Sequence, residues 1–154
     1  METLTKIKLA VTSSAFREGK KIPSRYTCDG NNINPPLTIG KVPGEAESLV
    51  LFVEDPDAPG GTFDHWIVWN IPPFNPIEEN TVPGIEGRNS AGNTGYIGPC
   101  PPHGKHRYLF TIYALDAELH LLSGSEKNEV MKAMENHIIA LGTLTGTFEK
   151  KKNQ

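Results

Sequence analysis

The sequence predicts an all-β fold with one helix in its C-terminal half, and three observations favour this class. The chain of 154 residues carries 15 Gly and 13 Pro, which are spread along its length and divide it into short segments, as is typical of β domains rather than helical bundles. Several of these segments alternate apolar and polar residues or are continuously apolar, as strands do. Only one segment has helical periodicity. At this length we expect a single domain, 1–154.

Five segments predict the strands. Residues 6–11 alternate, with Ile7, Leu9 and Val11 on one face. The continuous apolar run 49–53 predicts a central strand buried on both faces, and residues 65–70 predict a further strand. Residues 106–115 form the longest candidate, and because both of its faces are largely apolar it is expected at the centre of the sheet. Residues 143–148 alternate again and predict a closing strand.

The helix is predicted over residues 125–141. Ser123 and Glu126 have the spacing of a capping box at its start. Gly142 supplies the expected stop. The apolar residues at helical spacing, which we expect to pack on the core, are Val130, Met131, Met134, Ile138 and Leu141.

Charge and segment lengths exclude several classes of protein. With 15 basic and 18 acidic residues the net charge is −3, which argues against a general binder of nucleic acid or anionic membranes, although a few groups could still bind phosphate locally. No apolar run approaches the ~20 residues of a membrane-spanning helix, and residues 1–6 lack the pattern of a signal peptide. We therefore expect a cytoplasmic protein with no transmembrane segment, ending in a solvated lysine run at 150–152.

The two cysteines, Cys28 and Cys100, are too few for a disulfide framework or a four-cysteine zinc site. On compartment grounds we expect two reduced thiols. A single bridge between them is the alternative.

The first candidate segment for chemistry follows the predicted buried strand and reads Glu-Asp-Pro-Asp-Ala-Pro-Gly-Gly from residue 54. Asp55 and Asp57 are placed there just beyond a strand end, where side chains from a sheet rim converge. Pro56 and Pro59 stiffen the loop. The alternative is that these are ordinary turn residues, since Asp and Pro favour turns.

The second segment, Gly-Pro-Cys-Pro-Pro-His-Gly-Lys-His-Arg-Tyr from residue 98, leads directly into the longest predicted strand. Its prolines predict a rigid loop, in which a cis peptide bond is expected first at Cys100-Pro101. His106 is expected at the start of the strand that follows. The spacing of Cys100, His103 and His106 resembles a metal site, but a loop and alternating strand faces argue against shared coordination. Gly104-Lys105 is no phosphate-binding P-loop, because no Ser/Thr and helix follow.

Together, Asp55-Pro56-Asp57-Ala58-Pro59, His65-Trp66 and the second segment resemble the phosphatidylethanolamine-binding protein family, which includes the Raf kinase inhibitor-like proteins. The stretches 25–30 and 34–37 resemble its short bacterial and archaeal branch, and the likeness covers nearly the whole chain. It implies an antiparallel β-sandwich in which a large sheet packs on a smaller one, with an anion pocket at one end. The pocket residues it implies are Asp55, Asp57, His65, Pro101, His106 and Tyr108.

The resemblance also implies what the pocket takes: phosphate or a phospho-head-group such as phosphoethanolamine, with no cofactor. It implies a regulatory role toward kinases or proteases, and a homodimer is expected because short members of the family often pair. One departure is the short turn between Pro102 and His106. In this turn, His103 and Lys105 add polar or positive character, and neither residue corresponds to a pocket residue of the family.

Residue chemistry alone supports the same pocket. A phosphate beside two carboxylates is repelled unless these are otherwise engaged, for example in bonding to histidines that then donate to the anion. Trp66 and Tyr108 could form apolar walls, although Trp66 fits the core equally well. We therefore expect a non-enzymatic binding protein for a small phosphate-bearing ligand or for the anionic group of a protein partner. The alternative is a metal-dependent hydrolase that uses Asp55, Asp57, His65 and His106.

Overall fold

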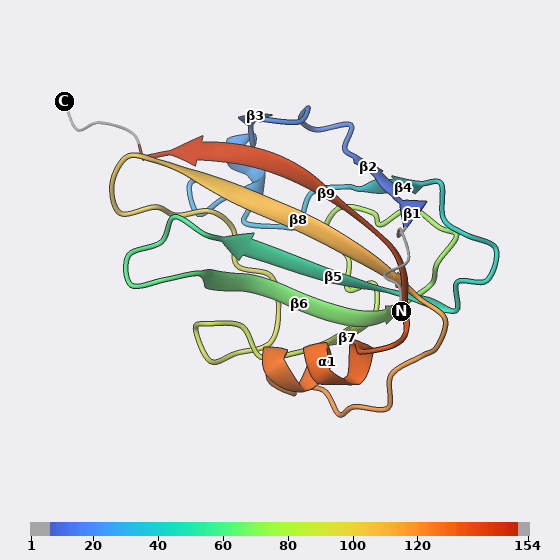
Figure 1. The fold of residues 1–154 in the computed structure, drawn as a ribbon. Helices are drawn as coiled ribbons and strands as arrows, with labels where there is room; N and C mark the ends of the chain where they lie inside the picture. Colours follow the sequence, from blue (N-terminus) through green and yellow to red (C-terminus); the bar gives the residue numbers. More distant parts are fainter. Residues whose placement is uncertain (1–6, 151–154) are drawn as a thin grey trace.

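A computed structural model describes residues 7–150 and shows a mostly β protein with one α-helix (Figure 1). A seven-stranded sheet has the strand order β1-β9-β8-β5-β6-β7, with β3 also paired to β9, and a separate sheet pairs β2 with β4. The long strands of the large sheet are β5 (Ser48–Asp55), β6 (Phe63–Ile71), β8 (Lys105–Leu115) and β9 (Ile138–Glu149). The shorter elements are β1 (Ile7–Lys8), β2 (Ala10–Thr12), β3 (Lys20–Lys21), a 3-10 turn (Ser24–Tyr26), β4 (Thr38–Gly40), β7 (Ile85–Glu86) and α1 (Lys127–Met134).

The centre of the large sheet is as predicted. Strand β5 is buried on both faces because its alternate residues enter two separate apolar clusters. On β8, one face packs into the cluster that also holds Val11 of β2, and the opposite face contributes Leu115 to the cluster under α1. The β8 residues on the first face are Tyr108, Phe110, Ile112 and Ala114. The helix and the two-stranded sheet therefore cover opposite faces of the large sheet.

The predicted sandwich agrees with this arrangement only in outline. The second sheet is a single pair of three-residue strands, packed on the core through Val11 and Ile39. The pairing is also not wholly antiparallel, since β1 and β3 both run parallel to β9.

The expectation of one strand over residues 6–11 is wrong where the structure describes it, from Ile7 onward. The chain changes sheets at Leu9, so that β1 joins the large sheet and β2 the small one. Leu9 and Val11 are buried while Ile7 is 51% exposed, because alternation along one strand does not continue across this break.

The predicted helix is too long, and its capping box is shifted. It spans Lys127–Met134, and the box is formed by Glu126 and Glu129 rather than by Ser123 and Glu126. The helix ends because Glu135 is extended and Asn136 adopts a positive φ of 69°. Of the predicted apolar stripe, Val130 and Met134 are buried and Met131 is half exposed, whereas Ile138 and Leu141 belong to β9.

Gly142 lies within β9 and does not end the helix. A β-carbon at this position would stand 2.3 Å from the carbonyl oxygen of Leu9. The glycine is therefore needed for the close approach of the first strands to β9. None of the helices in residues 7–150 has the length and apolar character needed to cross a bilayer.

Candidate functional site

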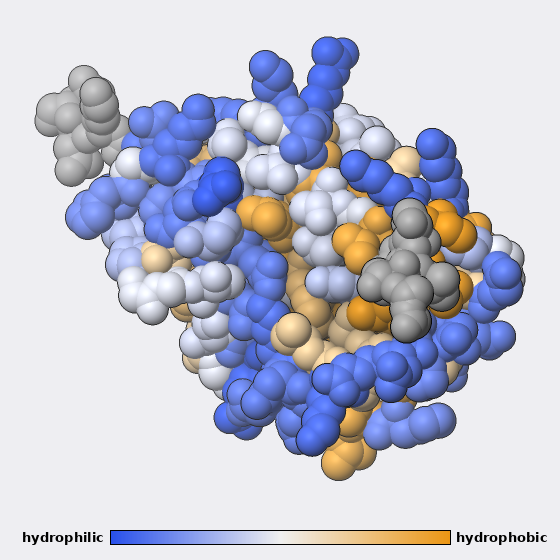
Figure 2. Space-filling model, in the orientation of Figure 1, coloured by the Kyte–Doolittle hydropathy of each residue, from blue (hydrophilic) through white to orange (hydrophobic). Residues whose placement is uncertain are grey.

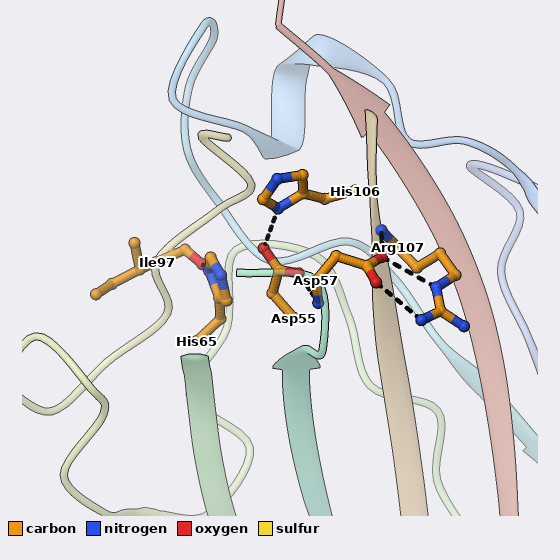
Figure 3. A network of polar contacts seen from close by, with 6 residues as sticks. All are labelled: Asp55, Asp57, His65, Ile97, His106 and Arg107. Atoms are coloured by element: carbon orange, nitrogen blue, oxygen red, sulfur yellow. Dashed lines mark hydrogen bonds and ion pairs between the residues drawn. The ribbon is translucent and has the colours of Figure 1, made fainter. Parts of the chain in front are cut away.

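The two candidate segments meet at one end of the large sheet, where β5 ends and β6 and β8 begin (Figures 1 and 3). A cavity of about 290 Å³ opens there. Its polar side chains are few and its walls are mostly apolar, as in typical small-ligand sites. The residues that line it are Asp55, Ala58, Pro59, Phe63, His65, Ile97, Gly98, Cys100, Pro101, Pro102, His106 and Tyr108.

Asp55 and His106 form a buried pair at the base of this cavity. The Nδ1 atom of His106 lies 2.6 Å from Oδ2 of Asp55, and the side chains are 10% and 5% exposed. The other carboxylate oxygen of Asp55 accepts a hydrogen bond from the backbone N–H of Asp57. Because a carboxylate only accepts, Nδ1 of His106 carries a proton, and Nε2 remains for a ligand.

His65 is held in a defined tautomer by the backbone. Its Nδ1 lies 2.7 Å from the carbonyl oxygen of Ile97, which only accepts, so Nδ1 carries the proton. Burial, the largest effect, lowers the pKa of His65 below its ordinary value of 6.5, although the hydrogen bond to Ile97 opposes the shift. At pH 7 the ring is therefore neutral, and its Nε2 is an acceptor.

Tyr108 stands between the two histidines. Its ring makes an edge contact with His65, at a centroid distance of 5.4 Å, and stacks on His106 at 6.3 Å. The residue is fully buried, and its hydroxyl makes no well-aligned hydrogen bond among the described residues, although Asp55 and the backbone of Cys100 lie close enough to affect its pKa. Burial, followed by the charge of Asp55, raises the pKa of Tyr108 well above its usual range, so the hydroxyl is neutral and can donate a hydrogen bond.

Pro101 lines the cavity as part of the segment 97–102. A disulfide joins Cys100 in this segment to Cys28, and the backbone N–H of Cys28 donates to the Pro99 carbonyl. The expectation of two reduced thiols is therefore wrong: the chain folds so that the two cysteines meet, with Cα atoms 5.5 Å apart. The expected cis bond at Cys100-Pro101 is also wrong, since every peptide bond of the described residues is trans.

Asp57 is placed next to the cavity but does not line it. Its carboxylate accepts from Nε (3.0 Å), a terminal guanidinium nitrogen (2.8 Å) and the backbone N–H (2.8 Å) of Arg107, and Figure 3 shows it turned away from His106. The hydrogen bonds from Arg107 lower the pKa of Asp57 to about 2. Its charge is thus neutralised by an arginine on the opposite face of β8, which reduces its repulsion of an anion in the cavity.

The four residues of the hydrolase alternative do not converge as metal ligands. Asp57 is committed to Arg107, and within residues 7–150 no group of three or more His, Cys, Asp or Glu side chains is arranged to hold a metal ion. Trp66 belongs to the core and not to the cavity wall, with its Nε1 donating to Glu86 at 2.8 Å. His103 is exposed and lies outside the lining.

Two contributors to the site are not predicted from the sequence, the carbonyl of Ile97 and the guanidinium of Arg107, and the Cys28–Cys100 bridge is predicted only as the alternative to two reduced thiols. Arg107 had a usable signal, because alternation along 106–108 places it on the face opposite His106 and Tyr108. The backbone carbonyl of a loop residue has no such signal.

Comparison with known proteins agrees with this fold. A sequence model of the family described as phosphatidylethanolamine-binding protein matches residues 12–149. A UPF0098 protein of Pyrococcus abyssi is 47% identical over 155 residues, covering 94% of this chain and 87% of that protein.

Two crystal structures are similar. One, of a putative phosphatidylethanolamine-binding protein homolog from Chlamydia trachomatis, has a TM-score of 0.90 and 46% identity and covers 94% of this chain and 99% of that chain. The other, of YbcL from E. coli, described as a new member of the mammalian family, has a TM-score of 0.85 and 31% identity with the same coverage.

Proposed function

On the premise that this chain belongs to the phosphatidylethanolamine-binding protein family, we propose that it is a non-enzymatic binding protein whose cavity takes a small phosphate-bearing anion. The anion is either a free phosphate or phospho-head-group, or the same group carried by a protein partner. In the second case the protein acts as a regulator, in the manner of an inhibitor of kinases or proteases.

The observation that carries this proposal is the Tyr108 hydroxyl. Tyr108 lines the cavity between two histidines, and its buried hydroxyl makes no well-aligned hydrogen bond among the described residues, although Asp55 and the Cys100 backbone lie near it. A buried hydroxyl without a partner costs about 1–3 kcal/mol. An anion in the cavity would accept from it, so ligand binding would recover this cost.

The remaining polar atoms favour one protonation state of the proposed ligand. In this proposal Tyr108 and Nε2 of His106 donate to the ligand, whereas the neutral ring of His65 supplies an acceptor at Nε2. Two donors and one acceptor match a singly protonated phosphate, which accepts through its unprotonated oxygens and donates through its hydroxyl. Asp55 would balance the charge of His106, and the Arg107 pair balances Asp57.

Isothermal titration calorimetry tests this proposal with three probes: inorganic phosphate, phosphoethanolamine and ethanolamine. We expect heat from the two phosphate-bearing probes and none from ethanolamine. Equal binding of ethanolamine would point to recognition of the ammonium group by Asp55 and would contradict a phosphate site. Absence of heat from every probe up to millimolar concentration would also contradict it.

Two further expectations stay predictions. Sedimentation at micromolar concentration tests the homodimer, and cell fractionation tests the cytoplasmic location. The Cys28–Cys100 disulfide argues against the cytoplasmic location, because disulfides are more common in oxidising compartments.

A further inference from the structure

We infer that the chain has a second anion-binding surface, a lysine-lined groove that takes an acidic peptide segment of a partner protein. The groove has a volume of about 570 Å³ and lies where β3, the end of β9 and the start of β8 run side by side. It is separate from the cavity described above. Its lining residues are Gly19, Lys20, Lys21, Lys105, Thr147, Phe148, Glu149 and Lys150, and we call it the lysine groove.

The charge of the lysine groove is opposite to that of the whole chain. Four lysines and one glutamate give it a formal charge of +3, whereas the chain carries −3. Within the described residues, none of the four lysines forms an ion pair with a carboxylate. Figure 2 shows hydrophilic side chains projecting from this corner of the molecule, over β3 and the end of β9. Concentrated positive charge of this kind attracts polyanions.

Strand pairing fixes the position of these lysines. Lys21 lies opposite Thr147 in the parallel β3–β9 pair, and Lys105 lies opposite Glu149 in the antiparallel β8–β9 pair. The ammonium of Lys21 also stands 5.9 Å from the centre of the Phe148 ring, within the range of a cation–π contact. Three of the four lysines, Lys20, Lys21 and Lys105, therefore belong to strands of the large sheet, and Lys150 follows directly after the end of β9.

The shape and lining favour a peptide over the two other common polyanions. An anionic membrane would be expected to contact exposed apolar side chains, and none of the large exposed ones lines the lysine groove. Single-stranded nucleic acid would need an exposed aromatic ring for base stacking. The only aromatic ring in the lining, Phe148, is 3% exposed and is covered by Lys21. A concave strip of ammonium groups fits the carboxylates of an extended acidic chain.

The lysine groove also lies beside the anion cavity. Phe148 of the groove is the direct cross-strand partner of His106 in the cavity, and Lys105 precedes His106 in the sequence. A partner that carries a phosphorylated residue next to acidic residues could therefore occupy both. The groove does not need the cavity in order to bind, so the two proposals are tested separately.

Fluorescence anisotropy of a labelled peptide of alternating Glu and Gly tests the inference, with a Gln-Gly peptide as the neutral probe. We expect the wild type to bind the acidic peptide at low salt and not the neutral one. The triple variant K21Q/K105Q/K150Q should bind at least about tenfold more weakly, since each exposed charge contributes up to about 1 kcal/mol. The matched triple variant K8Q/K41Q/K132Q removes the same charge from exposed positions elsewhere and should change the Kd by less than about twofold.

Two further variants keep the test decisive. E149Q removes the single acid of the groove and should tighten peptide binding, whereas H120Q, at an exposed histidine outside both linings, should leave binding of the peptide unchanged. Equal weakening by both lysine triples, or no binding by the wild type, would overturn the inference. Tighter, lysine-dependent binding of phosphatidylserine vesicles or of an oligo-dT strand would overturn the assignment to a peptide.

Discussion

The carboxylate of Asp55 and the imidazole of His106, 51 positions apart in the sequence, form a buried hydrogen bond of 2.6 Å where β5 ends and β8 begins. This contact joins the two proline-rich segments into one site. It also settles which nitrogen of His106 remains for a ligand. The function proposed for this chain depends on that geometry, and five predictions test it and its surroundings.

His106 supplies the donor on which anion binding is expected to depend most. H106Q keeps a side-chain donor for Asp55 but removes the charge that ring protonation would provide, and we expect phosphate affinity to fall at least about tenfold, since hydrogen bonds to charged groups contribute about 1.5–3 kcal/mol. Calorimetry measures the change. H103Q, at an exposed histidine outside the cavity lining, is the control. An equal loss in both variants would mean that His106 has no specific role.

The Tyr108 hydroxyl should lower the stability of the fold and raise its affinity for phosphate. Y108F removes a buried hydroxyl that makes no well-aligned hydrogen bond among the described residues, so the free energy of unfolding should rise by about 1 kcal/mol while phosphate affinity falls by about 3–10-fold. The matched variant is Y96F, because the Tyr96 hydroxyl donates to the Tyr26 carbonyl at 2.7 Å and lies outside the cavity. It should lose stability and keep its affinity. Urea denaturation with calorimetry separates the two patterns, and destabilisation by Y108F would contradict the account.

His65 should make stability depend on pH. Its pKa is lowered in the folded state from 6.5 by burial, so between the lowered value and 6.5 the unfolded chain binds more protons, and stability falls as the pH is lowered through this window. H65Q keeps a donor for the Ile97 carbonyl and should flatten the dependence. H120Q, at an exposed histidine, should not. Urea denaturation from about pH 8 to about pH 5 gives the slopes, and identical slopes for all three proteins would contradict the assignment.

The Asp57–Arg107 pair should stabilise the fold at neutral pH and lose this effect only as the pH falls toward about 2. Its contribution is present above the ordinary pKa of 3.8 and is lost as the pH falls through about 2. Because the pair is partly exposed, D57N should lower the free energy of unfolding at pH 7 by only about 1 kcal/mol. A double-mutant cycle with R107A measures the coupling. A coupling that persists unchanged at pH 2 would show that it is not ionic.

The Cys28–Cys100 bridge should support both the fold and the cavity wall. C28S/C100S should lower the free energy of unfolding by about 2–4 kcal/mol, and phosphate affinity should fall because Cys100 lines the cavity. The wild type in dithiothreitol should behave like the variant. Unchanged affinity in both samples would show that the wall is held in place without the bridge.

The sequence was most informative where the chain is buried. Strands β5, β6 and β8 were predicted because apolar runs and two-residue alternation reflect packing on both faces of a sheet. The convergence of Asp55, His65, Pro101, His106 and Tyr108 on one cavity is expected from the family resemblance, and the positions of Asp55 and His106 at strand ends also favour it.

The sequence is least informative where helical and strand periodicity overlap, or where a contact joins residues that are far apart in the chain. Residues 138–141 continue a helical stripe, yet they begin β9, because Asn136 turns the chain and register with β8 takes over. Cys28 and Cys100 are 72 positions apart, and their meeting depends on the whole fold. The turning of Asp57 toward Arg107 depends on side-chain geometry that spacing does not encode.

The most direct test is an NMR titration of the histidine ring nitrogens with phosphoethanolamine. The account predicts that the Nε2 signals of His65 and His106 shift together and saturate with a single Kd, while the signals of His103 and His120 stay in place. Saturable shifts elsewhere in the spectrum, with the His65 and His106 signals unmoved, would contradict it.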